Sequence, residues 1–353
     1  MQLFFCMNEY YRNMNVFVTG ATGLLGSHLI YSLLHSGHEV HALRRPSSDM
    51  GKVKAIFRQY PDGDHLWQKV HWVDGNILDP TPWKEDARKA AIVYHCAAVV
   101  SFAAGDQHLL LETNIQGAGN IASICLEGRI RLCYVSSVAA LGDALKPGEL
   151  IDEQTPAIPN REHSVYSESK SSAEKVIWEY IGRGLNAVIV CPSVILGAGM
   201  WDRSSAQLYK TAARGILFYT KGGTGYVDVR DVVELMVRLA EDEKVKGERF
   251  VLNGGNYTFQ ELFTYIARAN GNHPPHIYLR PWMTAMVWRF LALGGKLVGR
   301  KPAFTRETAR SAHHVSHYSS SRILSLYPDF HFYPIQETIE HIRLMLVMDA
   351  SIQ

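Results

Sequence analysis

A tyrosine and a lysine four positions apart, Tyr166 and Lys170, form a pair of side chains suited to acid–base chemistry. Residues four apart on a helix share one face, and apolar residues recur at helical spacing after the pair. A phenol with a pKa near ~10 is a poor base at neutral pH. A neighbouring ammonium stabilises the phenolate and lowers that pKa. The spacing therefore favours a tyrosine closer to the useful acid–base range, although such a pair is also common by chance on exposed helices.

A glycine-rich stretch predicts where a cofactor would bind beside this pair. The apolar run from Val16 leads into Gly20, Gly23 and Gly26, and an apolar helical pattern follows. This pattern predicts a strand, a tight turn and a helix, with a pyrophosphate approaching main-chain N–H groups at the helix N-terminus. The spacing is G-x-x-G-x-x-G, which departs from the usual G-x-G-x-x-G fingerprint.

Short apolar runs alternate with helical patterns as far as Ser193. Such alternation is typical of an α/β, Rossmann-type doubly wound parallel sheet. Ligands bind at the carboxyl ends of the strands in sheets of this kind, and Ser136 and Ser137 follow the fifth run. A hydroxyl, a phenol and an ammonium are therefore expected near one cofactor. The predicted strands cover 16–19, 39–43, 70–73, 91–98, 131–135 and 187–191.

The alternation weakens beyond Ser193, where many glycines break the chain into short elements. We expect an N-terminal extension, 1–13, that is disordered, a dinucleotide-binding domain over 14–193 and a smaller, mixed substrate-binding domain over 194–353. Segments of the second domain are expected to return to the first. Within it the patterns predict a helix from about 227 to 241, a strand over 250–252 and a helix over 259–270 capped by Thr258.

Arg44 and Arg45 stand at the end of the second predicted strand. An acidic residue at this place accepts the ribose 2′-hydroxyl of NAD, whereas an arginine accommodates the 2′-phosphate of NADP. No Asp or Glu occupies the position. NADP(H) is therefore favoured as cofactor, with NAD(H) as the alternative.

Composition narrows the class of protein. A hydrophobic content of 47% and a charged content of 20% fit a globular protein, and a net charge of +2 gives no sign of nucleic-acid binding. The five cysteines form no C-x-x-C pair, so we expect free thiols in a reducing compartment and a cytoplasmic location. No signal peptide is evident at the start. His313, His314 and His317 lack an acidic or Cys partner at ligand spacing, and no metal is expected.

The segment 281–298 is strongly apolar yet falls short of a comfortable bilayer span. One interpretation is a helix packed over the substrate cleft. The other is an interfacial helix resting on a membrane, or a lid over an apolar substrate. We therefore predict no transmembrane segment and leave peripheral membrane contact open.

From about Met14 to Ile342 the chain resembles the extended short-chain dehydrogenase/reductase family, also called the NAD-dependent epimerase/dehydratase family. The glycine-rich stretch, Asn114, the strand ending in Ser136 and Ser137, and the Tyr166–Lys170 pair match its motifs. The resemblance implies that Tyr166 is the acid–base residue, that Lys170 binds the nicotinamide ribose and lowers the pKa of Tyr166, and that Ser137, rather than Ser136, holds the substrate oxygen. It also implies cofactor contacts from Gly20, Thr22, Gly23, Leu24, Leu25, Gly26, Ala97 and Ala98, with Asn76 and Ile77 at the adenine and Pro192 and Ser193 at the nicotinamide.

The branch of the family is indicated by what surrounds these motifs. Val138-Ala139-Ala140 follows Ser137, where dehydratases of the family usually carry an acidic pair. Gly223-Thr224-Gly225 offers no arginine for the diphosphate of a nucleotide sugar, with Lys221 or Arg214 as the alternative. Arg44-Arg45, the apolar 281–298 segment and the 301–307 run look more like the dihydroflavonol reductase and 3β-hydroxysteroid dehydrogenase branch.

These features predict an NADP(H)-dependent oxidoreductase that interconverts a carbonyl and a secondary alcohol on a small, fairly apolar substrate. The alternative is an NAD-dependent nucleotide-sugar epimerase that uses the same Ser, Tyr and Lys for transient oxidation. A non-catalytic dinucleotide sensor is disfavoured, because such proteins tend to lose the Tyr–Lys pair. The resemblance further implies a homodimer, with the helix over 164–180 as the candidate interface.

Overall fold

The computed structural model describes residues 13–100, 105–144, 146, 148–156, 164–202, 204–298 and 306–352. Of the predicted extension 1–13, all but residue 13 lies outside these ranges, and so does most of the 301–307 run. A seven-stranded sheet with the order β11-β7-β5-β4-β1-β2-β3 forms the centre of the molecule, and each neighbouring pair is parallel. The strands are β1 Asn15–Thr19, β2 Glu39–Arg44, β3 His71–Asp74, β4 Ile92–His95, β5 Arg131–Val135, β7 Ala187–Pro192 and β11 Glu248–Leu252. The predicted doubly wound fold is confirmed.

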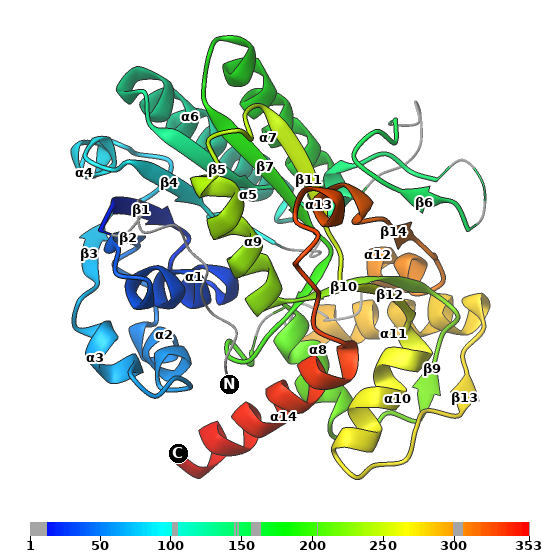
Figure 1. Cartoon of the computed structure of the whole chain (residues 1–353). Helices are drawn as coiled ribbons and strands as arrows, with labels where there is room; N and C mark the ends of the chain where they lie inside the picture. The colour runs from blue at the N-terminus through cyan, green and yellow to red at the C-terminus, as the bar shows by residue number, and fades with distance from the viewer. Residues whose placement is uncertain are drawn as a thin grey trace.

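Helices cover both faces of this sheet (Figure 1). The helices α1 (Leu24–His35) and α9 (Val229–Glu241) pack on one face, and α6 (Gly117–Gly128) and α7 (Val165–Gly182) pack on the other. Side chains alternate along β1 between the two layers, so that Val16 and Val18 join the first core while Phe17 joins the second. Burial on both faces explains why the strands are continuous apolar runs.

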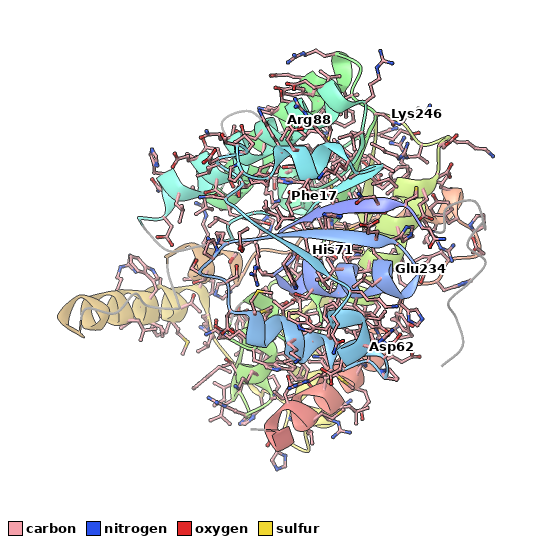
Figure 2. The ribbon with its side chains drawn as sticks, turned by 90° about the vertical axis from the view of Figure 1, so that its left-hand side faces the viewer. Phe17, Asp62, His71, Arg88, Glu234 and Lys246 are labelled. Carbon is pink, nitrogen blue, oxygen red and sulfur yellow. The ribbon has the colours of Figure 1, made fainter. Side chains whose placement is uncertain are left out.

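A third core lies beside the sheet and draws mainly on residues after Ser193. It contains a small sheet of β8 (Val194–Leu196), β10 (Gly223–Asp228) and β12 (Gly255–Thr258). Two short pairs complete the strands, β9 (Phe218–Tyr219) with β13 (Ile277–Tyr278) and β6 (Leu150–Ile151) with β14 (His317–Tyr318). Helix α11 (Pro281–Val298) extends away from the body of the molecule (Figure 2).

The remaining helices are short or lie at the edges. They are α2 Met50–Phe57, α3 Gly63–Trp67, α4 Lys84–Arg88, α5 Gln107–Leu111, η2 Glu112–Gln116, η3 Val138–Ala140, α8 Ser204–Ala212, α10 Phe259–Ala269, α12 Arg306–Ser311, α13 Ser321–Leu326 and α14 Ile335–Ile352.

Several boundaries differ from the sequence-based expectation by one to three residues. The fourth strand ends at His95 rather than at Ala98, because the Ala97 N–H leaves the ladder and donates to the Thr19 hydroxyl at 3.3 Å. The segment between α5 and α6 is a π-helix over Glu112–Gln116, which local patterns do not predict. Helix α10 ends one residue early, and Thr258 caps it with a complete capping box to Glu261.

Asp231 on α9 predicts how stability depends on pH. Burial, followed by the charge of Asp228, raises the pKa of Asp231 to about 8, and the Tyr333 N–H donates to its carboxylate at 3.0 Å. The folded state therefore keeps a proton that the unfolded state releases from about pH 4, so stability falls as the pH rises towards 8. Asp231→Asn should remove this slope and raise the free energy of unfolding at pH 8 by a few kcal/mol (~1.4 kcal/mol per pKa unit). Urea unfolding at pH 5 and pH 8 measures this, and an unchanged slope in the variant contradicts it.

Candidate active site

The turn between β1 and α1 lies against the end of β4. Gly20 has φ +67°, and a Cβ built on it would come within 2.5 Å of the Ala97 backbone nitrogen. A Cβ on Gly26 would lie 2.2 Å from the Gly20 carbonyl oxygen, and Gly23 is the N-cap residue of α1. β1 and β4 are the neighbouring strands at which the sheet order reverses, which is where open α/β sheets bind ligands. The described backbone thus fits a dinucleotide held at the N-terminus of α1.

Gly20→Ala is expected to weaken dinucleotide binding and to cost about 1–3 kcal/mol of stability, since the added Cβ meets fixed backbone in a left-handed conformation. Gly271 provides a matched control. Its φ is +70°, yet nothing lies within 4 Å of a Cβ built there. Gly271→Ala therefore carries the same backbone strain without the collision. NADPH titration and urea unfolding of both variants separate the backbone strain from the collision. An equal loss of NADPH binding in both variants would contradict the close approach of Gly20 to the Ala97 backbone.

The predicted adenosine end of the site is built from the ends of β2 and β3. The Arg44 Nε donates to Asp74 at 2.8 Å, and its guanidinium lies 5.8 Å from the centre of the Trp72 ring. Arg45 is exposed, and the loop after it returns to the glycine-rich turn, where Ser48 and Thr22 share a hydroxyl hydrogen bond of 3.3 Å. The basic loop and the turn are therefore neighbours.

The two residues predicted to contact the adenine, Asn76 and Ile77, differ in how far they are buried. Asn76 is exposed and its side-chain oxygen accepts from the Leu78 N–H, whereas Ile77 is buried against Gly117 of α6. The Trp83 indole donates to the Asn76 carbonyl at 2.9 Å and fixes the loop. Leu24 and Leu25 open α1 and pack partly buried on the first core.

Ser137, Tyr166 and Lys170 come together at the end of β5. Ser164 caps α7 through its hydroxyl, and the Ser167 hydroxyl donates to the Ala139 carbonyl at 2.6 Å. These bonds hold the start of α7 against the segment that follows β5. Tyr166 hydrogen bonds to the Ser137 side chain, and the Lys170 amine donates to the Val135 carbonyl at 3.0 Å.

Burial and one hydrogen bond determine the electrostatics of Tyr166 in this structure. Burial raises the pKa of Tyr166, and the hydrogen bond from Ser137 is what lowers it. The Lys170 amine donates to the Val135 carbonyl, and the expected effect of its ammonium on the pKa of Tyr166 stays a prediction. Burial lowers the pKa of Lys170 itself to about 8, so the amine can lose its proton not far above neutrality. Nearby, burial lowers the pKa of His95 to about 3, which keeps that ring neutral.

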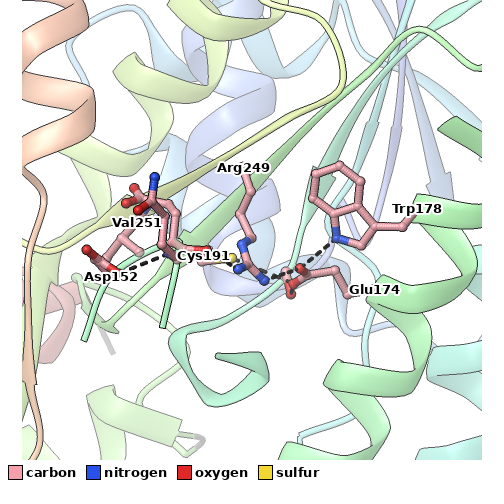
Figure 3. Close-up of polar contacts among 9 residues, drawn as sticks. Asp152, Glu174, Trp178, Cys191, Arg249 and Val251 are labelled. Atoms are coloured by element: carbon pink, nitrogen blue, oxygen red, sulfur yellow. Dashed lines mark hydrogen bonds and ion pairs between the residues drawn. The ribbon is translucent and has the colours of Figure 1, made fainter. Parts of the chain in front are cut away.

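The buried carboxylate of Glu174 lies between Arg249 and Trp178 (Figure 3). It accepts hydrogen bonds from the Ser136 hydroxyl, from the Trp178 indole at 3.1 Å and from Arg249 at 2.8 Å. The Ser136 hydroxyl is therefore engaged in the core, which leaves Ser137 to face Tyr166. Sequence reasoning missed Glu174, although its position one turn after Lys170 was a readable signal.

The far side of the site is formed by the end of β7. Pro192 is the last residue of that strand, and Ser193 follows with its N–H donating to the Leu252 carbonyl. The Ser193 hydroxyl is buried and has no hydrogen-bond partner among the described residues, so it fits a polar group of a bound cofactor. Ala97 and Ala98 are partly exposed between this end and the glycine-rich turn.

Asn114 completes the arrangement from the π-helix η2, a distortion often found at functional sites. Its amide donates to the Ser169 hydroxyl at 3.0 Å and to the Val99 carbonyl, and its oxygen accepts from the Val99 N–H. The chain after β4 is thereby tied to α7. Across the ranges that the structure describes, no three His, Cys, Asp or Glu side chains gather to hold a metal ion.

Comparison with known proteins agrees with this geometry. The model of the NAD dependent epimerase/dehydratase family matches residues 16–253. The chain belongs to this family. It is 28% identical over 276 residues to the sterol demethylase protein B of Methylococcus capsulatus (76% of this chain and 78% of the relative). It is also 28% identical over 263 residues to a 4-hydroxy-2-methyl-3-oxo-4-farnesyl-3,4-dihydroquinoline-1-oxide ketoreductase of Stigmatella aurantiaca (73% of this chain and 74% of the relative).

The solved structure of the protein named gox2253 superposes with a TM-score of 0.78 at 26% identity, over 96% of this chain and 99% of that one. Dihydroflavonol 4-reductase of Gerbera hybrida is matched as well, as the predicted branch implies. The chain is an NAD(P)-dependent enzyme of the extended short-chain dehydrogenase/reductase type, and both reductases and epimerases occur among the proteins it resembles.

Proposed function

We propose that the protein is an NADP(H)-dependent oxidoreductase that interconverts a carbonyl and a secondary alcohol on a small, fairly apolar substrate. The observation that carries this proposal is the hydrogen bond between Tyr166 and Ser137, with the Lys170 amine at the same strand end. A phenol and a hydroxyl that already meet can both contact one substrate oxygen.

Ser137, Tyr166 and Lys170 then have distinct roles in the reaction. Ser137 donates a hydrogen bond to the substrate oxygen and polarises it, and Tyr166 delivers or removes the proton on that oxygen. Lys170 binds the nicotinamide ribose, and its ammonium stabilises the phenolate once its amine turns from the Val135 carbonyl. The nicotinamide supplies or accepts the hydride when bound.

The surroundings of Ser137 favour redox chemistry over dehydration. Val138, Ala139 and Ala140 follow it as the short helix η3, so no carboxylic acid stands there to protonate a leaving hydroxyl. Two relatives are named for a sterol and for a farnesylated ketone, which supports an apolar substrate. We propose that residues 194–353 shape the pocket for it.

A titration with NADPH and NADH, followed by nicotinamide fluorescence, tests the cofactor proposal. NADPH should bind more tightly than NADH. Arg44→Ala with Arg45→Ala should remove this preference, by about 10- to 100-fold in Kd, which is the loss of one charge-assisted hydrogen bond of about 1.5–3 kcal/mol. Arg183→Ala is the control, since Arg183 follows α7 at the opposite edge of the sheet. Preference for NADH, or a dinucleotide that stays bound and does not exchange, would instead support the epimerase.

We further propose a cytoplasmic homodimer that pairs through α7. Its exposed residues include Glu168, Lys175 and Glu179, so the face is polar, and sedimentation velocity tests the stoichiometry.

The four described cysteines are free, and Cys125, Cys133 and Cys191 are buried, which supports a reducing compartment.

A further inference from the structure

Helix α11 exposes apolar side chains along its described part. Trp282 is 60% exposed, and Met286 and Leu291 are each 46% exposed. The inner side is fixed by Thr284, which is buried and shares a hydrogen bond of 2.9 Å with the His313 ring. Figure 2 shows the helix extending beyond the other elements. Exposed apolar side chains grouped in this way mark a contact surface rather than a core.

The same surface continues onto the strand pair beside the helix. Phe218 of β9 and Ile277 of β13 are register partners, and both are exposed. Leu217 precedes them and is exposed too, and the Leu279 N–H donates to the Tyr219 carbonyl just before α11 begins. We call the exposed side of β9, β13 and α11 the α11 surface.

Basic residues predominate in the segments that form and flank the α11 surface, with Glu261 of α10 and Glu307 of α12 at their borders. Residues 203–227 and 262–306 contain no Asp or Glu, yet they hold 11 of the 36 Lys and Arg of the chain. All 34 acidic residues lie elsewhere, against 25 basic ones. Arg214, Lys221, Arg268, Arg280 and Arg289 are exposed, and none of them pairs with a carboxylate within the described residues. These two stretches therefore carry 11 positive charges and no negative one, although the net charge of the chain is +2.

We propose that the α11 surface docks the enzyme on an anionic lipid bilayer, with α11 lying in the interface plane. Apolar side chains enter the headgroup boundary, and the surrounding cations bind the lipid phosphates. Among the described helices none is long and apolar enough to cross a bilayer, so the helix rests on the membrane. A second copy fits the surface poorly, because a two-fold contact would bring these unpaired cations together.

This inference rests on surface charge and exposure and is independent of the proposed reaction. Its test is co-sedimentation of the full-length protein with vesicles of phosphatidylcholine alone and of an equal mixture with phosphatidylglycerol. Binding should require the anionic lipid and weaken as salt is raised. Vesicle binding is measured directly, so a protein that does not bind vesicles leaves the oxidoreductase proposal unaffected. A protein without turnover likewise leaves the membrane proposal unaffected.

Two pairs of variants separate the apolar from the charged contribution. Trp282→Ser should weaken vesicle binding by about tenfold, since it removes apolar area that enters the interface. Val347→Ser is its control, because Val347 is 58% exposed on α14, whose carboxylates include Glu337 and Glu340. Arg280→Gln with Arg289→Gln should weaken binding by about 25-fold, at about fivefold for each cation removed. Lys246→Gln, far from α11 in Figure 2, should change nothing.

Binding to pure phosphatidylcholine as strong as to the anionic mixture would overturn the proposal, as would no binding to either at low salt. A protein that does not bind vesicles but dissociates from dimer to monomer on Trp282→Ser would show that the surface joins two copies. A change in KM for an apolar ketone in the absence of lipid, with vesicle binding unaltered, would identify α11 as a lid.

Discussion

Replacing Tyr166 by phenylalanine is expected to lower kcat by about 10²- to 10⁴-fold, the usual contribution of general acid–base catalysis. The ring stays in place, so only the proton-bearing hydroxyl and its bond to Ser137 are lost. NADPH binding should remain nearly unchanged. Steady-state reduction of a ketone found by screening, together with fluorescence titration of NADPH, measures both quantities.

Tyr94→Phe is the matched control for this substitution. Tyr94 is fully buried on β4, and its hydroxyl has no hydrogen-bond partner among the described residues. Removing that hydroxyl should leave kcat and NADPH affinity unaffected. If both Tyr166→Phe and Tyr94→Phe retain turnover, the phenol of Tyr166 is not the acid–base group and the proposed mechanism is wrong.

The second large effect is expected on stability, at the ion pair between Arg249 and Glu174. Glu174 is buried, and Arg249 also donates to the Glu153 carbonyl. Arg249→Leu leaves the carboxylate buried without its cation, and breaking a buried pair in this way costs about 3–5 kcal/mol. Urea unfolding of the variant should show this loss at pH 7.

The double variant Arg249→Leu with Glu174→Leu tests the cause. Replacing both partners of a buried pair by apolar groups is often close to neutral, so the double variant should recover much of the lost stability. An additive loss in the double variant would mean that the two side chains act by packing alone. Because Ser136 also bonds Glu174, the double variant should still lower kcat by loosening the segment that carries Ser137.

The fold could be predicted from sequence because most of its signals are local. Each central strand is a short apolar run, and the capping box at Thr258 and the glycine-rich turn are readable from neighbouring residues. The order of Ser137, Tyr166 and Lys170 along the chain was enough to place them on one sheet edge. Their roles remain proposals.

What sequence reasoning missed depends on residues that are far apart. The engagement of Ser136 by Glu174, and of Glu174 by Arg249, joins three elements separated by up to 113 positions along the chain. The hydrogen bond from the Lys170 amine to the Val135 carbonyl likewise joins α7 to another element, and helical spacing gave no sign of it. Spacing fixes which face a side chain occupies but not which partner it finds.

The central sheet is completed by its last strand along the sequence, β11, so folding during synthesis depends on when β11 emerges. β11 pairs with β7 across a separation of about 60 residues, and Arg131 on β5 donates to the carbonyls of Leu239, Asp242 and Val245 near it. A nascent chain that has emerged only to Ser193 exposes the open edge of β7 and leaves the Arg131 guanidinium without these acceptors. Such an edge invites pairing with other chains. The nucleotide-binding half therefore gains its seventh strand and the acceptors of Arg131 only once residue 252 is synthesised, and an exchange of domains between relatives should cut after β11.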